Sequence, residues 1–280
     1  MTSFTLVLCV YAKENPEFLT ACLESILGQT VLPDEFLIVK DGPLTERLEE
    51  VLQGLKFPNE LRIIALPAAM TSGPARAEGI NEARHGWVAL MDSDDVCRPG
   101  RFELQLGMIE SRPELGLIGG QIAEFTETPD RTAAIREVPL SHCDIMKCAK
   151  KRNPFNQQTV MLRRDAAREA GNYRYFPGFE DYDLWIRMLM NGTAGANSPE
   201  ILADVRTGEG MYGRRRGVGY IRSEWAMQKQ LRGIGITSRA EFMRNALLRI
   251  PVRLLPEKML AAVYRRFARK KAPIGGISKW

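Results

Sequence analysis

Two groups of acidic residues are the first candidates for chemistry. The stretch "MDSDDVCRPGR" places Asp92, Asp94 and Asp95 within four positions, directly after the apolar run 87–91. Neighbouring carboxylates repel one another and resist leaving water, so a cation or a set of donors must compensate them. Three such groups can bind Mg²⁺ or Mn²⁺, with phosphates and water completing the shell. Taken alone, the motif also fits a solvated turn that caps the next helix.

The second acidic group lies in "GFEDYDLWIRMLMNG", where Glu180, Asp181 and Asp183 precede an amphipathic helical pattern. Carboxylates at a helix start are favoured by capping and by the helix dipole, so a structural role for Glu180 or Asp183 stays open. Near a metal-bound diphosphate and partly shielded from water, Asp181 could have a raised pKa. It could then act as general base on an acceptor hydroxyl.

A third feature is the basic C-terminal part of the chain. From Arg206 to Trp280 there are 18 Lys and Arg against 4 Asp and Glu, which suggests an anionic partner. Arg214, Arg215 and Arg216 could bind either a donor diphosphate or a lipid-linked diphosphate acceptor, although a solvated charge run is the alternative. The segment 242–271 mixes apolar residues with cations, as interfacial helices do, but helices packed on a catalytic domain also show apolar stripes.

The elements that must position these residues follow from periodicity. Apolar β-rich runs at 5–11, 35–39, 61–66 and 87–91 alternate with helical patterns at 16–27, 44–55 and 74–84. Such alternation predicts an α/β fold with a mostly parallel, Rossmann-like sheet covered on both faces. Ligands of these sheets bind at the carboxyl ends of the strands. We therefore expect Asp41, in "VKDG", and Asp92 to line one crevice.

After Arg101 the pattern becomes irregular. We expect helices near 101–111 and 181–190, strands at 115–125 and 159–162, and a helical, basic chain beyond residue 212. The expected division is a catalytic domain over residues 1–210 and a helical extension over residues 211–280.

Composition argues against several other classes of protein. No apolar run approaches the roughly 20 residues of a spanning helix, and the N-terminal run lacks the features of a secretory signal, so we expect a cytoplasmic protein. Five cysteines without a C-x-x-C pair argue against disulfides and a cysteine zinc site. Because His85 and His142 are far apart, a Ser-His-Asp triad is disfavoured. No nucleic-acid motif accompanies the basic tail.

Five blocks follow one another along the chain at compatible spacing: "VYAKENPEFLTACLESILGQT", "LIVKDGPLT", "MDSDDVCRPGRFELQ", "NPFNQQTVMLRR" and "FEDYDLWIRMLMNG". Together they resemble the family-two glycosyltransferases, which use nucleotide sugars and adopt the GT-A fold. The resemblance covers nearly the whole chain and is closest to exopolysaccharide and O-antigen enzymes of the amylovoran-biosynthesis type.

For the donor side, the resemblance implies that Tyr11 and Asp41 contact the nucleotide base and that Arg76 reaches the nucleotide or its phosphates. Asp92 and Ser93 belong to the same donor site, where Asp92 holds the ribose or a metal-bound water.

For catalysis, the resemblance implies that Asp94 is the principal ligand of Mg²⁺ or Mn²⁺, with Asp92 beside it. Asp181 of the Glu180–Asp181 pair becomes the base of a single, inverting displacement. The sequence departs from many relatives at Lys40, Ala77 and Gln157, and the last of these positions is often histidine.

The activity implied is transfer of a sugar, from a UDP-sugar first of all, to a polyprenyl-diphosphate-linked saccharide. It would take place at the anionic inner face of the cell membrane, with the protein attached peripherally. A noncatalytic nucleotide-sugar-binding or scaffold relative is the alternative, which the intact D-S-D and E-D pairs disfavour. A glycoside hydrolase would also use two carboxylates but needs neither the alternating start nor the basic tail.

Overall fold

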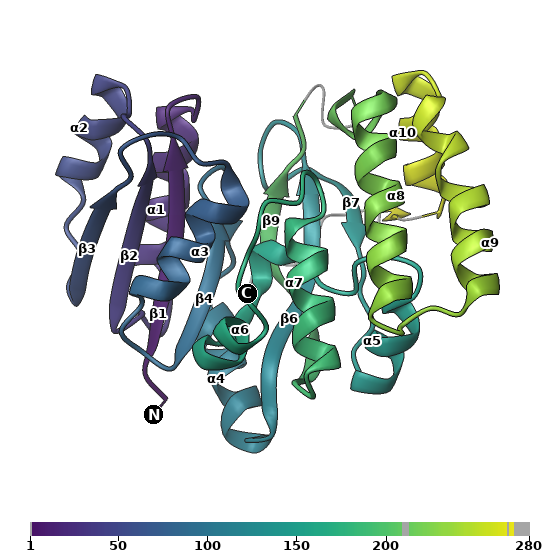
Figure 1. Ribbon diagram of the computed structural model, residues 1–280. Helices are drawn as coiled ribbons and strands as arrows, with labels where there is room; N and C mark the ends of the chain where they lie inside the picture. Colours follow the sequence, from purple (N-terminus) through teal and green to yellow (C-terminus); the bar gives the residue numbers. More distant parts are fainter. Residues whose placement is uncertain (1, 209–212, 268, 272–280) are drawn as a thin grey trace.

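The computed structural model describes residues 2–208, 213–267 and 269–271. The first 92 residues form the expected alternation of strands and helices (Figure 1). Strands β1 (Phe4–Tyr11), β2 (Glu35–Asp41), β3 (Glu60–Ala65) and β4 (Trp87–Asp92) are parallel, in the order β3-β2-β1-β4. They are connected by α1 (Pro16–Leu27), α2 (Glu46–Gly54) and α3 (Ser72–Glu82).

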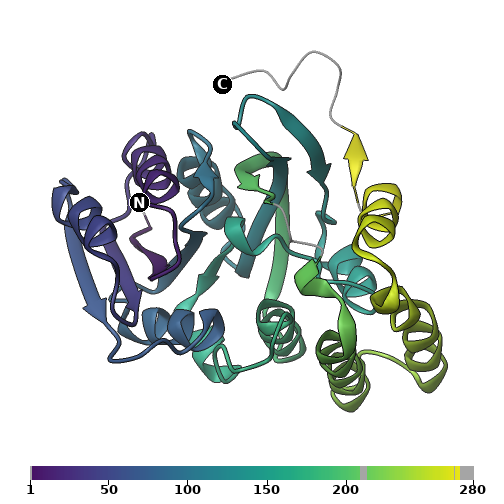
Figure 2. The ribbon, with the colours of Figure 1, turned by 90° about the horizontal axis from the view of Figure 1, so that it is seen from above.

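Both faces of this sheet are covered, which explains why β1 is a nearly continuous apolar run. On one face, Phe4, Leu6 and Leu8 pack in a core with residues of α1, α2 and α4 (Arg101–Ser111). On the other, Val7 packs in a second core with residues of α3 and α7 (Glu180–Met190). Figure 2 shows the two helical layers on either side of the sheet.

The second half of the sheet is mixed. β6 (Leu115–Phe125) is fully buried and runs parallel to β9 (Ala194–Arg206), whereas β7 (Thr132–Arg136) and β8 (Met161–Arg163) are antiparallel to it. The short β8 also pairs with β4, and β5 (Val96–Cys97) pairs with β9. The remaining elements here are α5 (His142–Ala149), the 3₁₀ turn η1 (Gln157–Thr159) and α6 (Arg164–Glu169).

The C-terminal region is helical, as expected. It contains η2 (Gly213–Arg215), α8 (Gly217–Gly233), α9 (Arg239–Arg249), η3 (Pro251–Leu254) and α10 (Glu257–Phe267). Met227, Leu231 and Ile236 pack against the side of α7 that carries Tyr182 and Ile186. The last strand, β10 (Lys270–Lys271), returns to the sheet and pairs with β7. The expected boundary at 210/211 lies outside the described residues.

Among the described residues, no helix combines the length and the apolar character required to cross a membrane.

Candidate active site

The carboxyl ends of β1, β2 and β4 bring the predicted donor residues together. Tyr11 pairs in register with Asp41, and Cys9 pairs with Asp92. Because side chains alternate along a strand, Cys9 and Tyr11 lie on the same face as Val7, which is the face that α3 covers. Asp41 and Asp92, which pair in register with Tyr11 and Cys9, therefore lie on the α3 side of the sheet.

Helix α3 delivers Arg76 to this edge. Its Nη2 lies 2.6 Å from Asp92 Oδ1, and both side chains are largely buried. The helix can approach the sheet because Gly79 has no side chain. A Cβ at that position would meet Val39 Cγ2 at 3.2 Å and would also collide with Val7. The Arg76–Asp92 pair thus depends on a close helix–strand contact.

Asp41 is held by the loop that follows β3. Its Oδ1 accepts a 2.6 Å hydrogen bond from the backbone N–H of Met70, and the side chain is buried. The next residue, Gly42, has φ of 83°, and a Cβ there would meet Ala69 N at 2.8 Å. Only glycine adopts this close approach without strain. Tyr11 is 45% exposed beside Asp41.

The acidic loop after β4 holds its carboxylates in different environments. Burial, together with the negative charges of Asp92 and Glu14, raises the pKa of Asp94 to about 7. Asp95 is buried, and its Oδ1 accepts a 2.8 Å bond from the backbone N–H of Arg206. The hydroxyl of Ser93 donates to Glu14. Asp95 thus has a structural partner, while the negative charge around Asp94 is not balanced.

That imbalance is what a divalent cation would neutralise, so Asp94 and Asp92 fit Mg²⁺ or Mn²⁺. Within residues 2–208, 213–267 and 269–271, no three His, Cys, Asp or Glu side chains form a metal cage. Mg²⁺ commonly takes one or two carboxylates and completes its shell with water and substrate phosphates, which agrees with this donor set.

Arg206 organises the acidic loop and was not identified from the sequence. Its guanidinium lies 3.6 Å from the Phe18 ring centroid and 4.6 Å from that of Phe125, and its Nε donates to the backbone oxygen of Asp94 at 3.2 Å. No signal in the sequence links these residues, because the contact spans 112 positions.

The three carboxylates of the second acidic group, Glu180, Asp181 and Asp183, have different surroundings at the start of α7. Asp183 is fully buried and pairs with Arg174 and Arg187, so it is structural. Asp181 accepts a 2.8 Å bond at Oδ2 from Asn153 Nδ2, which fixes its orientation. Burial, reinforced by the charge of Asp181, raises the pKa of Glu180.

Tyr173 lies within electrostatic range of Asp92 and Asp181 and was also missed by the sequence analysis. Its buried hydroxyl has no hydrogen-bond partner among the described residues. Burial raises its pKa, with smaller electrostatic contributions from Arg76, Asp181 and Asp92. The Arg76 guanidinium lies 6.0 Å from the ring centroid. The Nε2 of Gln157 is likewise buried without a partner in the described chain.

Of the arginines predicted to bind phosphate, Arg215 and Arg216 differ in their exposure. Arg215 is half-buried in η2, and Arg216 is exposed at the start of α8. The side chain of Arg214 lies outside what the structure describes.

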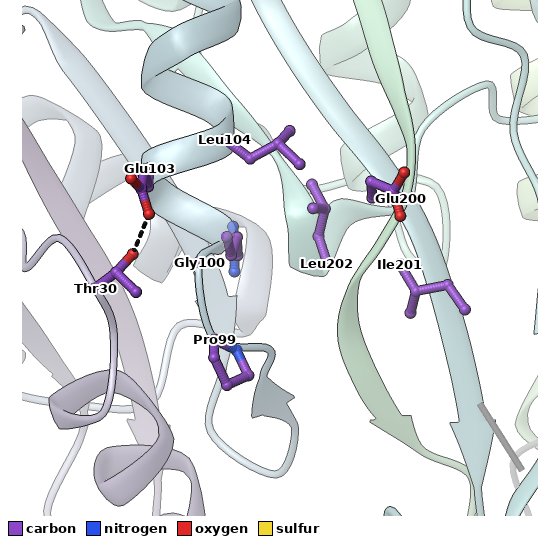
Figure 3. A pocket seen from close by; sticks show the side chains of 9 residues that line it. Thr30, Pro99, Gly100, Glu103, Leu104, Glu200, Ile201 and Leu202 are labelled. Carbon is purple, nitrogen blue, oxygen red and sulfur yellow. Dashed lines mark hydrogen bonds between the residues drawn. The ribbon is translucent and has the colours of Figure 1, made fainter. Parts of the chain in front are cut away.

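A pocket of about 450 Å³ lies elsewhere, between α4 and β9 (Figure 3). Leu104 and Leu202 point toward one another across it, and Glu103 accepts a hydrogen bond from Thr30 at its edge. None of the predicted site residues lines this pocket.

Residues 5–171 match the model of glycosyl transferase family 2, and this match includes β1 to β4 with the acidic loop. The chain belongs to this family of glycosyltransferases. It is 36% identical to the amylovoran biosynthesis glycosyltransferase AmsE of Erwinia amylovora, over 94% of this chain and 98% of AmsE. It is 32% identical to an Escherichia coli UDP-Gal:alpha-D-GlcNAc-diphosphoundecaprenol beta-1,3-galactosyltransferase, over 95% of this chain and 97% of that enzyme.

Two solved structures confirm the GT-A fold expected for a family 2 chain. S. aureus TarS 1-349 in complex with UDP-GlcNAc aligns with a TM-score of 0.66 at 12% identity, over 95% of this chain and 74% of TarS. The mannosyltransferase PcManGT of Pyrobaculum calidifontis, in complex with GDP-Man and Mn²⁺, gives 0.64 at 13% identity, over 94% and 75%.

Proposed function

We propose that this glycosyltransferase moves a sugar from a nucleotide-sugar donor to a lipid-linked saccharide by a metal-dependent, inverting displacement. The observation that carries the proposal is the shared edge of the sheet. There, the Arg76–Asp92 ion pair lies close to Asp94 in the acidic loop. Tyr173 is within electrostatic range of Arg76, Asp92 and Asp181.

Tyr11, Asp41 and Arg76 bind the nucleotide in this proposal. The ring of Tyr11 faces the base from the end of β1, and Asp41 accepts hydrogen bonds from it. A UDP-sugar is the favoured donor, because TarS was solved with UDP-GlcNAc and the E. coli relative is named for UDP-Gal. Ser93 contributes indirectly, since its hydroxyl holds Glu14.

Asp94 and Asp92 would hold Mg²⁺ or Mn²⁺, and such an ion would supply positive charge to offset the negative charge of the leaving diphosphate. The Mn²⁺ in the PcManGT complex supports this assignment. Arg76 keeps Asp92 oriented through its Oδ1, and Arg206 fixes the backbone of Asp94.

Asp181 is the general base that removes the proton of the acceptor hydroxyl. Asn153 holds its Oδ2, so that the carboxylate keeps one orientation while the acceptor arrives. Glu180 lies beside it against Gly73 and is the alternative base.

The acceptor is a saccharide on a lipid diphosphate, as in the name of the E. coli relative, and the pathway is exopolysaccharide or O-antigen synthesis, as in the name of AmsE. The enzyme reaches it by docking peripherally on the inner face of the cell membrane. Helix α9 supports this step, because Met243, Leu247 and Leu248 are exposed beside the exposed cations Arg239 and Arg244. Apolar side chains flanked by cations suit an anionic lipid surface.

The decisive experiment replaces Asp94 by asparagine, which keeps the shape and removes one charge. Donor hydrolysis and transfer should lose their dependence on Mg²⁺ or Mn²⁺, and turnover should fall by orders of magnitude. Asp95→Asn is the matched control, since Asp95 already has a backbone partner. Full metal-stimulated turnover in Asp94→Asn would refute the assignment.

A second pair of variants tests the base. Asp181→Asn should leave donor affinity within a few fold and slow transfer by roughly 10² to 10⁴. If Glu180→Gln gives that loss and Asp181→Asn does not, Glu180 is the base. A protein that binds the donor but does not turn it over, whichever metal and acceptor are supplied, would instead be a noncatalytic relative.

A further inference from the structure

Three arginines from distant parts of the chain lie near the edge of the sheet that β7 and β10 form. Arg136 ends β7, Arg215 lies in η2, and Arg269 directly precedes β10. The register of β10 on β7 places Arg269 opposite Arg136, because Lys270 pairs with Ile135. Figure 1 shows β7 on the side of the sheet that faces α8 and α10, away from β1 and β2.

The charge of this cluster is only partly balanced. Arg269 Nε lies 2.5 Å from Glu124 Oε2, and both side chains are buried. The Arg136 guanidinium instead meets two backbone oxygens at long range, Asn153 O at 3.5 Å and Phe155 O at 3.4 Å. Throughout the described chain, Arg136 has no carboxylate within ion-pair distance. Burial, with the charges of Arg269 and Arg215, lowers the pKa of Arg136 to about 10.

One residue connects this cluster to the proposed base. The side-chain amide of Asn153 donates to Asp181 at 2.8 Å, while its backbone oxygen faces Arg136. Asp181 also lies within electrostatic range of Arg136. An anion bound by Arg136 would therefore lie near the proposed base, with Asn153 in contact with both residues.

We propose that Arg136, together with Arg215 and Arg269, binds the diphosphate of the lipid-linked acceptor. This inference rests on the proposed function. In an acceptor such as the one in the E. coli relative's name, one sugar ring separates the diphosphate from the reacting hydroxyl. A hydroxyl at Asp181 and a diphosphate at Arg136 match that arrangement. Guanidinium groups bind phosphate oxygens bidentately, and an incompletely paired one is available to do so.

The test compares two acceptors that carry the same sugar, one on an alkyl diphosphate and one as a neutral alkyl glycoside. In wild type, the diphosphate-linked acceptor should be strongly preferred in kcat/KM. Arg136→Gln should reduce that preference about 10- to 100-fold, as expected for losing charge-assisted hydrogen bonds. The loss should appear mainly in the KM for the diphosphate-linked acceptor.

Matched variants separate binding from folding. Arg131→Gln removes an exposed arginine near the start of β7, paired only with Glu127 at the surface, and should leave the preference unchanged. Arg136→Lys keeps the charge but not the bidentate geometry and should restore part of the preference. Thermal melting of each variant identifies any loss that comes from misfolding.

Calorimetric binding of the alkyl-diphosphate saccharide is measured without turnover, so it distinguishes this inference from the proposed function. Arg136-dependent binding in a protein that transfers no sugar would keep the subsite and reject the glycosyl transfer proposed for Asp94 and Asp181. Equal losses for both acceptors would make Arg136 structural. If Arg136→Gln raised the KM for the donor as much as the KM for the diphosphate-linked acceptor, the three arginines would bind the donor diphosphate instead. Either of these last two results overturns the inference.

Discussion

Helices α1 and α9 are similar in length, with 12 and 11 residues, but they differ in which residues they bury against the rest of the protein. α1 buries its apolar residues Leu19, Cys22, Leu23 and Ile26. α9 buries Asn245 and Ala246, while Leu247 and Leu248 are 69% and 65% exposed.

The reason is a polar interior beneath α9. Glu224 of α8 is fully buried, and its carboxylate oxygens lie 2.6 Å from Arg249 Nε and 2.7 Å from Arg253 Nη2. Asn245 Nδ2 donates to the backbone oxygen of Lys150 at 2.7 Å and to Gln228 Oε1 at 3.2 Å. The comparison teaches that hydrogen bonds and ion pairs orient α9, and that this orientation leaves Leu247 and Leu248 exposed.

The largest expected effect is on Glu224. Glu224→Gln removes the counter-charge of the buried Arg253 and the partly buried Arg249, and should lower the free energy of unfolding by about 3–5 kcal/mol. Urea unfolding measures this effect. Glu241→Gln, at the partly exposed start of α9, is the control. It weakens the helix cap with Ser238 and the ion pair with Lys150, and should cost only about 0.5–2 kcal/mol. If both variants unfold like wild type, the polar interior does not hold α9.

Helix α1, which is held by apolar packing, should lose stability when a buried apolar side chain is shortened. Ile26 of α1 is fully buried, so Ile26→Ala should cost about 2–5 kcal/mol in urea unfolding. The matched change in α9, Leu247→Ala, should stay within about 0.5 kcal/mol because that side chain is exposed. Similar costs for the two variants would remove the contrast between the helices.

Acid should weaken the α8–α9 network in a defined direction. Burial opposes ionisation of Glu224, but Arg249 and Arg253 outweigh it and lower the pKa below its ordinary value of 4.5. A carboxyl with a lowered folded-state pKa stabilises the protein above its unfolded pKa, and this contribution is lost as the pH falls through the folded value. The stability gap between wild type and Glu224→Gln should therefore shrink below about pH 4.5. A gap that stays constant down to pH 3 would contradict this assignment.

Removing the exposed leucines of α9 should change the stability of the protein least but should clearly weaken its binding to lipid. Replacing Leu247 and Leu248 together by serine should leave unfolding within about 0.5 kcal/mol of wild type. Sedimentation with anionic vesicles should nevertheless show binding reduced about tenfold or more, because each inserted leucine contributes hydrophobic stabilisation. Leu27→Ser, at the exposed end of α1, is the control. Unchanged vesicle binding in the double variant would argue against membrane docking through α9.

The same contrast explains how much of the fold could be predicted. The bounds of α1, α4 and β6 agree with the expectation to the residue, because in each case periodicity and burial coincide. Strand β9 was missed because its "ANSPE" segment has turn-forming composition, and in the structure its pairing with β6 shifts register near there. The helical character of the C-terminal region was predicted, but not which face of α9 is inside.

In the candidate active site, the sequence predicted correctly which residues lie together when those residues follow the ends of parallel strands. Asp41 and Asp92 share an edge because parallel strands align their carboxyl ends. Arg206, Asn153 and Tyr173 were missed, since each acts through contacts that only the folded chain creates. The roles of Asp94 and Asp181 stay predictions until the variants are measured.

The contact of Gly79 with β1 and β2 has a further consequence, which is entropic. Because α3 lies directly on the sheet, the backbone of Arg76 is fixed before any nucleotide arrives. Ordering a long side chain during binding costs about 0.5–1.5 kcal/mol. The ion pair with Asp92 orders the Arg76 side chain when the chain folds, so the donor binding that we propose for Arg76 need not lose this conformational entropy again. We therefore predict that a larger residue at position 79, by holding α3 away from the sheet, would weaken donor binding.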